Sequence, residues 1–394
     1  MQDIDLKKLI PCYFGAFIGP MGGMAVLTLI PFMSKGLNTS IEIMSLAITF
    51  YMIPFAFIQF FSGALADVFN PIRILIFGYA VFVLGSFFCA LAPGIGWFLS
   101  ARLIQGFGGA FIFPLVMALL ADVVPPDYLG RVMGVLGMVF SAGVSTGPIM
   151  AGVVEVYLGW RWFFGIVSLQ SAAACLLFVW GFRQYSDRRR SGQVSQIFTL
   201  IKVALRDKNV VFLSLSASVL FFSFIGVLTF TSDYLEEVFR LKSNQIGLII
   251  SSAGIAGIFA SPVAGYLGDR KGRNTVAYGG FVMIVISYMA IIFTEYSYLK
   301  YLLIFSIYGI GSAVAWTSMN TLAVEIRPEM KKTVAALYNF FRFFGYSMAP
   351  IVLTPLYKVL HIKSVFVVTG LASILSCILL LRVQTKPLRA GEQP

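Results

Sequence analysis

Gly265-Tyr-Leu-Gly-Asp269-Arg270-Lys271-Gly272-Arg273 is the stretch that decides the fold, and it has a shortened copy, Gly63-Ala-Leu-Ala-Asp67. Each stretch lies where a long apolar segment ends in a charged turn before the next apolar segment. The copy lies 202 positions earlier, about half of the 394-residue chain. The same offset relates Gly147-Pro148 to Ala349-Pro350, and a nearly equal one relates Asp122-Val-Val-Pro125 to Glu325-Ile-Arg-Pro328. Three pairs of landmarks at one spacing indicate a duplicated unit.

The composition predicts an all-α membrane protein. The chain is 59% hydrophobic and 12% charged, with a mean hydropathy of +0.88, whereas a soluble domain has about 25% charged residues. Apolar segments of about 20 residues recur along the chain, and each is long enough to cross a hydrocarbon core of about 30 Å as a helix. Internal repeats of this size in such a chain are typical of the parallel halves of secondary transporters.

We predict twelve transmembrane helices and assign their orientation from the basic residues. The expected spans are 9–33, 42–66, 74–93, 97–120, 132–156, 161–182, 209–233, 243–267, 275–294, 299–323, 333–357 and 362–383. An even number of crossings puts both termini on one side of the membrane. Most lysines and arginines fall in the termini and the even-numbered loops, so the positive-inside rule places this side in the cytoplasm. The expected location is the cell membrane, with both termini cytoplasmic.

The chain divides into two predicted six-helix bundles, residues 1–182 and residues 209–394, the second with a short cytoplasmic tail. The linker between them, 183–208, begins with Arg188-Arg189-Arg190. Behind this triplet, apolar residues recur at helical spacing, which predicts an amphipathic helix on the cytoplasmic membrane surface. A nucleic-acid partner is the alternative for the basic triplet and for the net charge of +12. We prefer the topological interpretation and expect no nucleic-acid partner.

The sequence lacks the motifs of an enzyme. It contains no nucleotide-binding loop, no metal-ligand spacing and no pairing of a nucleophile with a base. Its four cysteines lie in or beside apolar segments and are interpreted as small buried hydrophobic residues. We therefore expect neither an enzymatic activity, nor a cofactor, nor a bound metal.

Four motifs, in order along nearly the whole chain, resemble the major facilitator superfamily. The stretch 265–273 is similar to the signature loop of this family, and the first copy keeps Gly63, Leu65, Asp67 and Arg73. The first copy departs from the pattern, with Val68, Asn70 and Pro71 where the family usually has Arg, Gly and Arg. Three further stretches resemble the drug:proton antiporter branch: Arg102-Leu-Ile-Gln105-Gly106, Gly143-Val-Ser-Thr-Gly147-Pro148-Ile-Met-Ala-Gly152 and Gly159-Trp160-Arg161-Trp162.

The resemblance implies two pseudo-symmetric six-helix bundles that export a small molecule by alternating access. The loops at Asp67 and Asp269 would latch the cytoplasmic side, and Arg102 would respond to a nearby acid. The predicted gating and coupling residues are Asp67, Arg73, Arg102, Arg131, Asp233, Asp269, Arg270 and Arg273.

Glycines in the fifth span form a stripe with two open interpretations. Gly143, Gly147 and Gly152 lie on roughly one helical face, where small residues allow close packing of helices. Pro148 removes a backbone donor and bends the helix. The stripe is either a hinge for the movement or a static packing surface, and the two roles do not exclude each other.

Arg342 is the predicted centre of the substrate site. It lies near the middle of the eleventh span, where a charge is costly and usually faces a cavity or a partner. Tyr338, Asn339 and Tyr346 lie at helical spacing from it, and together they form one polar stripe. The alternative for Arg342 is a structural pair or hydrogen bonds to carbonyl groups. Further polar candidates in spans that face the cavity by resemblance are Gln59, Gln105, Trp316 and Asn320, together with Tyr13 and Tyr308.

The acidic residues give little support for proton coupling. No carboxylate lies near the middle of any predicted span. Asp233 is the nearest candidate and Glu155 is the second, although each also fits an ordinary charge at the end of a span. Proton coupling therefore depends on the resemblance more than on the residues. His361, the only histidine, is interpreted as a surface residue.

We therefore expect a monomeric secondary transporter that exports small amphiphilic molecules in exchange for protons. Its partners would be the small-molecule substrate, protons and the lipid bilayer. The first alternative is an importer or facilitator of an organic anion, which the central arginine would suit. The second alternative, from another class, is a membrane sensor that binds a ligand without transporting it.

Overall fold

The computed structural model describes residues 6–68, 70–183 and 194–384, with side chains except at 6–7, 62–68, 121, 126–131, 134 and 194–198. Over these ranges the secondary structure is helical throughout. The elements are α1 (Leu6–Gly36), α2 (Ile41–Val68), α3 (Pro71–Ala90), α4 (Ile95–Val123), α5 (Pro126–Leu158), α6 (Trp160–Gly181), α7 (Val194–Ala204), α8 (Lys208–Phe239), α9 (Ser243–Lys271), α10 (Arg273–Phe293), α11 (Tyr298–Glu325), the short 3₁₀ helix η1 (Pro328–Met330) and α12 (Lys331–Leu381).

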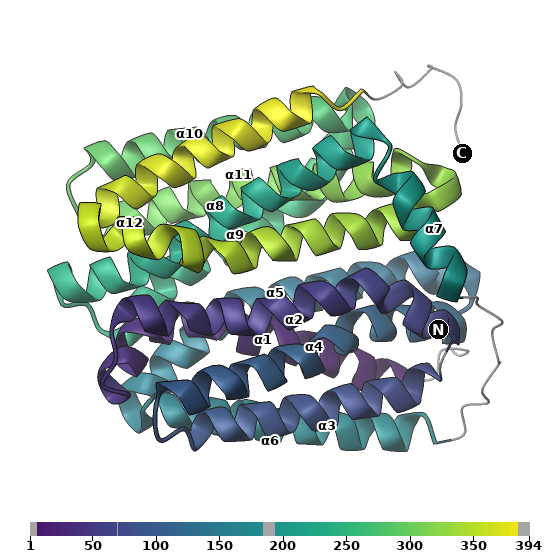
Figure 1. Ribbon diagram of the computed structural model, residues 1–394, viewed down its shortest axis with the longest axis horizontal. Helices are drawn as coiled ribbons and strands as arrows, with labels where there is room; N and C mark the ends of the chain where they lie inside the picture. Colours follow the sequence, from purple (N-terminus) through teal and green to yellow (C-terminus); the bar gives the residue numbers. More distant parts are fainter. Residues whose placement is uncertain (1–5, 69, 184–193, 385–394) are drawn as a thin grey trace.

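The described helices cross a membrane twelve times. Eleven of them are long and apolar enough to span, but α12 has 51 residues and would be about 75 Å long as one straight helix. Its backbone breaks at His361, where φ is 57° and ψ is −174°, and Figure 1 shows the chain folding back on itself there. The break lies between the predicted spans 333–357 and 362–383, so the prediction of twelve transmembrane helices is confirmed.

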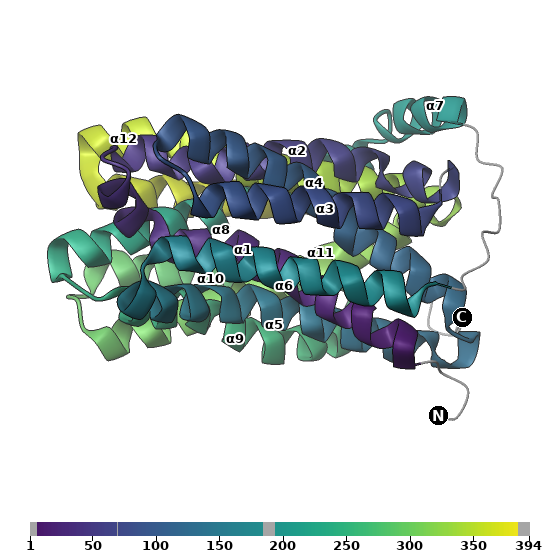
Figure 2. The same ribbon diagram turned by 90° about the horizontal axis from the view of Figure 1, so that it is seen from below.

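The helices form two bundles that pack side by side. Figure 1 shows α1–α6 in one group and α8–α12 in the other. We call these groups the N-half and the C-half. Between the halves, α5 packs on α9 and α2 packs on α12. The start of α1, the end of α12 and α7 lie at the same end of the bundle in Figures 1 and 2, as an even number of crossings requires. We call this the termini end, and the other the opposite end.

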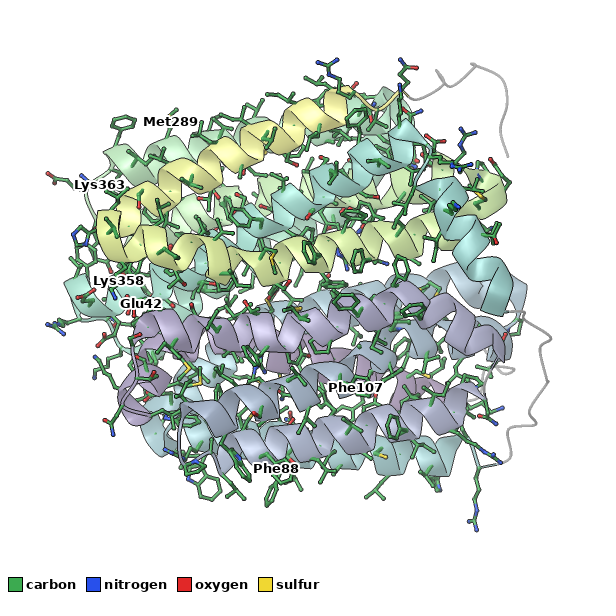
Figure 3. The ribbon with its side chains drawn as sticks, in the orientation of Figure 1. Glu42, Phe88, Phe107, Met289, Lys358 and Lys363 are labelled. Atoms are coloured by element: carbon green, nitrogen blue, oxygen red, sulfur yellow. The ribbon has the colours of Figure 1, made fainter. Side chains whose placement is uncertain are left out.

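The surface of the bundle is suited to lipid along its sides. Large apolar side chains are strongly exposed there, for example Phe293 at 81%, Phe259 at 74% and Leu169 at 73%. An apolar surface this extensive marks contact with a membrane rather than with water. In Figure 3, Phe88 and Met289 lie along the two long sides, whereas the charged Glu42, Lys358 and Lys363 gather at the opposite end.

The departure of the first signature loop from the family pattern has a local explanation. The side chain of Asn70 accepts hydrogen bonds from the backbone N–H groups of Ile72 at 2.9 Å and Arg73 at 3.1 Å, and Pro71 is the first residue of α3. An asparagine cap followed by proline is a strong helix start. In the second loop, Gly272 joins α9 to α10 with a φ of 87°, which a residue with a side chain rarely adopts. Each loop thus starts its next helix in a different way.

The helix α7 lies across the termini end, where Figure 1 shows it running between the two halves. Ala204, the last residue of α7, packs with Val210, Val334 and Leu337 in a small apolar cluster that also touches Phe60 of α2. The helix therefore contacts both halves. A helix, α7, lies within the predicted linker 183–208, and its role as an amphipathic helix on the membrane surface remains a prediction.

Candidate functional site

The side chain of Arg342 is buried in the C-half with no charged partner among the described residues. Its exposed fraction is 9%. Its guanidinium carbon lies 4.4 Å from the ring centre of Phe343, 5.1 Å from that of Phe221 and 5.3 Å from that of Trp316. Its Nε atom is buried and has no hydrogen-bond partner. The guanidinium is therefore held by aromatic rings and keeps hydrogen-bonding capacity for another group.

Two other polar atoms near Arg342 are buried without a described partner. They are Oη of Tyr338 and Nε1 of Trp316. Tyr338 lies one helical turn before Arg342, and Trp316 contacts the guanidinium. Most buried polar atoms in folded proteins are hydrogen-bonded. A group of such atoms around one arginine is therefore a candidate site for a ligand that accepts hydrogen bonds.

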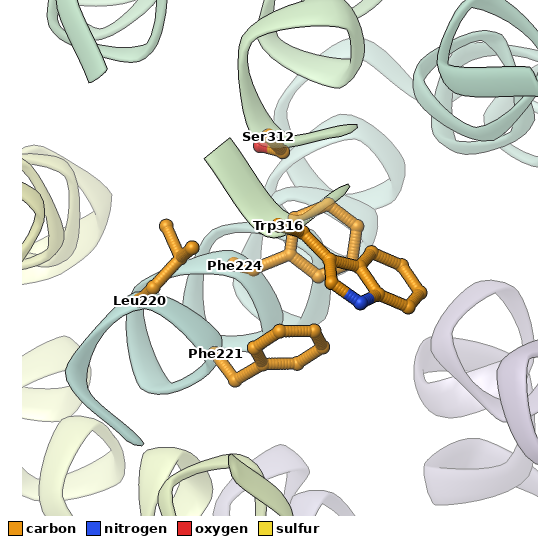
Figure 4. Close-up of a pocket in the computed structure, with 5 residues that line it drawn as sticks. All are labelled: Leu220, Phe221, Phe224, Ser312 and Trp316. Atoms are coloured by element: carbon orange, nitrogen blue, oxygen red, sulfur yellow. The ribbon is translucent and has the colours of Figure 1, made fainter. Parts of the chain in front are cut away.

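An apolar pocket adjoins this group. It is lined by Leu220, Phe221 and Phe224 of α8 and by Ser312 and Trp316 of α11, and Figure 4 shows the three aromatic rings close to one another. In this conformation the space open to water is about 10 Å³, which holds about one water molecule. A larger ligand therefore needs the rings or the halves to move apart.

Behind the pocket, a network of hydroxyl groups joins four helices of the C-half. The ring of Phe224 stacks on Tyr308 with the ring centres 5.7 Å apart. The hydroxyl of Tyr308 lies 3.4 Å from that of Tyr288, which lies 2.6 Å from Ser223 Oγ. Ser223 in turn lies 2.7 Å from Ser373 Oγ. Because these residues belong to α8, α10, α11 and α12, the network fixes the wall against which the pocket is built.

Arg102, the buried arginine of the N-half, has polar partners. Its exposed fraction is 1%. Nε donates to the carbonyl oxygen of Ala47 at 3.3 Å, Nη1 donates to Oε1 of Gln105, and the guanidinium lies 4.2 Å above the ring of Tyr51. The acid expected to act on Arg102 is not among these described partners. Its predicted role in coupling remains a prediction.

The other predicted substrate residues are divided between the halves. Gln105 donates from Nε2 to Ser86 Oγ at 2.8 Å, and Gln59 donates to the carbonyl oxygen of Ala110 at 3.4 Å, so both make contacts inside the N-half. Tyr346 donates its hydroxyl to Met24 Sδ at 3.2 Å and so joins the halves. Asn339 and Asn320 are partly buried. The structure thus places Tyr338 and Trp316 beside Arg342, whereas Gln59 and Gln105 form hydrogen bonds within the N-half.

Polar contacts close the opposite end between the two halves. Lys35 Nζ lies 2.5 Å from Glu236 Oε1, and Ser243 Oγ lies 2.9 Å from Glu155 Oε2 and 3.0 Å from the carbonyl oxygen of Gly152, either of which can accept its proton. Between α2 and α12, Ser45 Oγ lies 3.0 Å from Thr354 Oγ1, and Thr49 donates to the carbonyl oxygen of Ser347 at 2.7 Å. In this conformation, these contacts separate Arg342 from any solute outside the opposite end.

Asp233 lies just inside this closed end. Its exposed fraction is 4%, and its Oδ2 atom accepts a hydrogen bond from the hydroxyl of Tyr357 at 2.5 Å. No described ion pair includes Asp233, although Lys35 and Glu236 pair one turn further out on the same helix face. A buried carboxyl group held by one hydroxyl is a suitable place for a proton, because protonation removes the buried charge.

The glycine stripe of α5 touches two different helices. A side chain at Gly143 or Gly147 would overlap the backbone of α1, at the carbonyl groups of Phe17 and Met21. A side chain at Gly152 would overlap the backbone of α9 at Ser243, and Gly247 of α9 is equally close to the carbonyl of Pro148. The stripe therefore packs α5 inside the N-half at one level and against the C-half at another. Its role as a hinge remains a prediction.

At the termini end, the second signature loop ties three helices of the C-half together. Arg273 of α10 pairs with Asp269 of α9, lies 3.3 Å from Glu325 of α11 and donates to the carbonyl oxygen of Gly265 at 3.0 Å. Gly268 leaves room for the Arg273 guanidinium, since a β-carbon there would lie 2.7 Å from Nη1. These described contacts stay within the C-half.

The remaining predicted gating residues have weaker structural support. Arg270 stacks on Tyr266, with its guanidinium carbon 4.4 Å from the ring centre, and Arg73 is exposed. The side chains of Asp67 and Arg131 lie outside those that the structure describes. A cytoplasmic latch formed by Asp67 and Asp269 therefore stays a prediction.

Several residues of the site were not identified from the sequence. Phe221, Phe343 and Ser312 carry no sequence signal that separates them from other apolar or small residues in the spans. Tyr357 follows Arg342 by 15 positions, about four helical turns, and a search for polar residues on the Arg342 face would have reached it. The pairing of Lys35 with Glu236 needed the fold, because 201 residues separate them.

Comparison with known proteins identifies the same architecture. A family model described as Major Facilitator Superfamily matches residues 12–350. The chain is 22% identical to the "Uncharacterized MFS-type transporter YwfA" of Bacillus subtilis, over 96% of this chain and 93% of that protein. It is 27% identical to the "Multidrug resistance protein B homolog" of Mycobacterium tuberculosis, over 60% of this chain, and spans about half (54%) of that relative.

A solved structure shares the fold. It is a bacterial homologue of the human lysosomal transporter Spinster, in an inward-facing and unoccupied conformation. The TM-score is 0.77 at 14% sequence identity, and the match covers 96% of this chain and 98% of the other. At this identity the similarity concerns the arrangement of helices alone.

Proposed function

This chain belongs to the major facilitator superfamily, and from that premise we propose that it exports small amphiphilic molecules across the cell membrane in exchange for protons. Three observations support the proposal: the buried arginine site in the C-half, the polar closure of the opposite end, and the similarity to a relative named as a multidrug resistance protein. The excess of basic residues in the termini and even-numbered loops assigns the termini end to the cytoplasm.

The group of unpaired polar atoms around Arg342 is the observation that carries this function. Arg342, Tyr338 and Trp316 offer hydrogen bonds on one side, and the pocket of Leu220, Phe221 and Phe224 offers apolar surface on the other. A binding site that combines a few directed polar groups with an apolar wall suits a small amphiphile. In this proposal Asn339, Tyr346, Gln59, Gln105 and Asn320 line the path or support its walls.

Transport would follow from rocking of the two bundles, residues 1–182 and residues 209–394, about the site. In the described conformation the opposite end is closed by Lys35–Glu236 and by the contacts of α5 with α9. Opening that end has to break these contacts, and the termini end has to close in exchange. The signature loops at Asp67 and Asp269 are the proposed latch of the closed termini end, with Arg73, Arg131 and Arg270 as further proposed gating residues.

Proton coupling is assigned to Asp233. The groups that face its carboxyl are Tyr357 of α12 and Lys35 of α1, with Glu236 and Glu237 on its own helix. When the opposite end opens, the carboxyl group gains access to water and can exchange its proton. While the opposite end is closed, burial beside one hydroxyl favours the protonated form, so the proton taken up outside is carried into the state that faces the termini end. For an exchange, cargo binding in that state has to drive release of the proton toward the cytoplasm.

Purified protein in proteoliposomes tests the proposal. An interior pH dye is recorded while cationic, neutral and anionic fluorescent amphiphiles are added, with a proton gradient imposed in either direction. The expected result is movement of one compound class against its gradient together with a counterflow of protons. Flux of cargo that is indifferent to the pH gradient contradicts proton exchange, and absence of any flux contradicts transport.

A second candidate is the import or facilitated flux of an organic anion. It is favoured by one observation, the absence of a described carboxylate beside Arg342. The same experiment separates the two, since a facilitator dissipates the cargo gradient without moving protons. A sensor that only binds its ligand gives a binding signal and no flux.

A further inference from the structure

We propose that the cargo of the Arg342 site is an aromatic anion, with its carboxylate on Arg342 and its ring in the adjoining apolar pocket. This inference depends on the transport function proposed above and adds the charge and shape of the cargo. Cationic amphiphiles would then be poor ligands of this site.

The two buried arginines of the molecule provide an internal comparison. Arg102 in the N-half is bonded to the carbonyl oxygen of Ala47 and the amide oxygen of Gln105. Arg342 in the C-half is also largely buried, with an exposed fraction of 9% against 1% for Arg102, but has only aromatic rings as its described partners. A buried N–H group without a hydrogen bond, such as Nε of Arg342, is unfavourable, and an incoming oxyanion relieves that cost. The comparison indicates that Arg342 is reserved for a ligand and Arg102 is not.

The charges around the site also favour an anion. The described carboxylates of the spanning helices lie at their ends, with Asp233 and Glu155 toward the opposite end and Asp269 and Glu325 at the termini end. A cation in the pocket would therefore meet the guanidinium without a compensating carboxylate from this described set. The aromatic faces that could stabilise a cation are already in contact with Arg342.

The geometry of the donors fits a carboxylate. Guanidinium and indole N–H groups can only donate, and the hydroxyl of Tyr338 can donate as well. The unpaired atoms Arg342 Nε, Trp316 Nε1 and Tyr338 Oη belong to neighbouring side chains of α11 and α12. A carboxylate accepts several hydrogen bonds at its two oxygens. An amide can accept at one oxygen only, and an ammonium cannot accept at all.

The apolar side of the site fits a flat ring. Leu220, Phe221 and Phe224 lie on one face of α8, and the indole ring of Trp316 faces Phe221 edge-on, with the ring centres 5.2 Å apart. Figure 4 shows the narrow space between these rings. Aromatic rings pack well in such arrangements, at separations of about 4.5–7 Å between centres. A bulky branched cargo would have to displace more of the wall than a flat one.

A matched series of ligands tests the inference. The compounds 2-naphthylacetate, 2-naphthylacetamide and 2-(2-naphthyl)ethylamine share one ring and differ in the charge of the head group. Their binding to the purified full-length protein is measured by calorimetry and by the shift in melting temperature. We expect the acetate to bind at least about tenfold more tightly than the amide, since a charged hydrogen-bonded pair is stronger than a neutral one. The amine is expected to bind most weakly.

Variants connect this selectivity with the named residues. Arg342→Gln should weaken binding of the acetate by about 10- to 100-fold and leave the amide nearly unchanged. Tyr338→Phe and Trp316→Phe each keep a ring and remove a donor, so each should weaken the acetate by a smaller factor. Arg240→Gln, at an exposed arginine at the end of α8, is the control for the loss of one positive charge. If Arg342→Gln does not fold, the two donor variants carry the test.

The outcomes separate this inference from the proposed function. Preference of the wild type for the amine or the amide, or binding of none of the three compounds at millimolar concentration, overturns the anionic cargo. The anionic cargo is also overturned if all three site variants bind the acetate as tightly as the wild type does. Transport of a different compound class in proteoliposomes would then leave the exporter proposal standing. Tight binding of the acetate without flux of any compound overturns the exporter and leaves the assigned ligand class intact.

Discussion

Replacing Gly152 with alanine should loosen the contact between α5 and α9 that closes the opposite end. The added β-carbon would lie 2.8 Å from the carbonyl carbon of Ser243 and 2.9 Å from Cα of Asn244. These are backbone atoms, which cannot rotate away as a side chain can. The two helices would have to separate by about 1 Å at this level, because packed interiors have few voids to absorb the methyl group.

The size of the effect follows from two terms. Overpacking of this kind costs about 1–3 kcal/mol. Separation also weakens the hydrogen bond from Ser243 to the carbonyl of Gly152, now 3.0 Å, which is worth about 1 kcal/mol. The higher helix propensity of alanine acts equally on open and closed conformations. A net shift of about 2 kcal/mol would change the ratio of closed to open molecules by about 30-fold.

Distances between spin labels measure this shift. Labels at Ser40 in the N-half and Val238 in the C-half, both exposed, report the width of the opposite end in protein whose four native cysteines have been replaced. Gly137→Ala on the same helix is the matched control, because a β-carbon there meets nothing within 4 Å. The reasoning is refuted if both glycine variants give the label distances and transport rates of the wild type.

Three further variants probe separate parts of the cycle. Arg342→Ala should abolish transport while expression and the elution profile stay normal, and undiminished flux would exclude its place in the cavity. Asp233→Asn should stop proton movement on addition of cargo but retain exchange of cargo for cargo. Glu295→Gln, at an exposed glutamate between α10 and α11, should behave as the wild type, and retained proton movement in Asp233→Asn assigns coupling elsewhere. Arg273→Ala should lower the free energy of unfolding by only about 1 kcal/mol, since its partners are largely exposed, and a much larger fall in melting temperature would contradict this.

The architecture was predictable because the membrane leaves few alternatives. Backbone groups in hydrocarbon must be hydrogen-bonded within the segment, so apolar length and charged turns predict the helices directly. Even the break at His361 lies between two predicted spans, although the chain is helical immediately before and after it. The first turns of α5 were not predicted, because the helix begins at Pro126 rather than at 132 and these turns lie outside the apolar segment.

The site was only partly predictable, since a spacing identifies a helix face and not what that face meets. Arg342 and Tyr338 were identified from one stripe on α12, and Trp316 was named as a separate candidate. Gln105 was expected to face the cavity by resemblance; its amide bonds to Ser86 and Arg102 inside the N-half, and its place in the substrate path stays a prediction. The partners of Arg342 and Asp233 come from α8, α11 and α12, and sequence distance gives no information about such contacts.

The close approach of α5 to α9 involves main-chain atoms at Gly152, Ser243, Pro148 and Gly247, whereas the ligand wall consists of side chains on α8, α11 and α12. The contact between the halves and the proposed ligand wall therefore depend on different residues. If the proposed function holds, exchanging an aromatic residue of the wall changes which compound is accepted without altering this contact. A protein divided in this way can acquire new cargoes by single substitutions while its mechanical cycle stays the same.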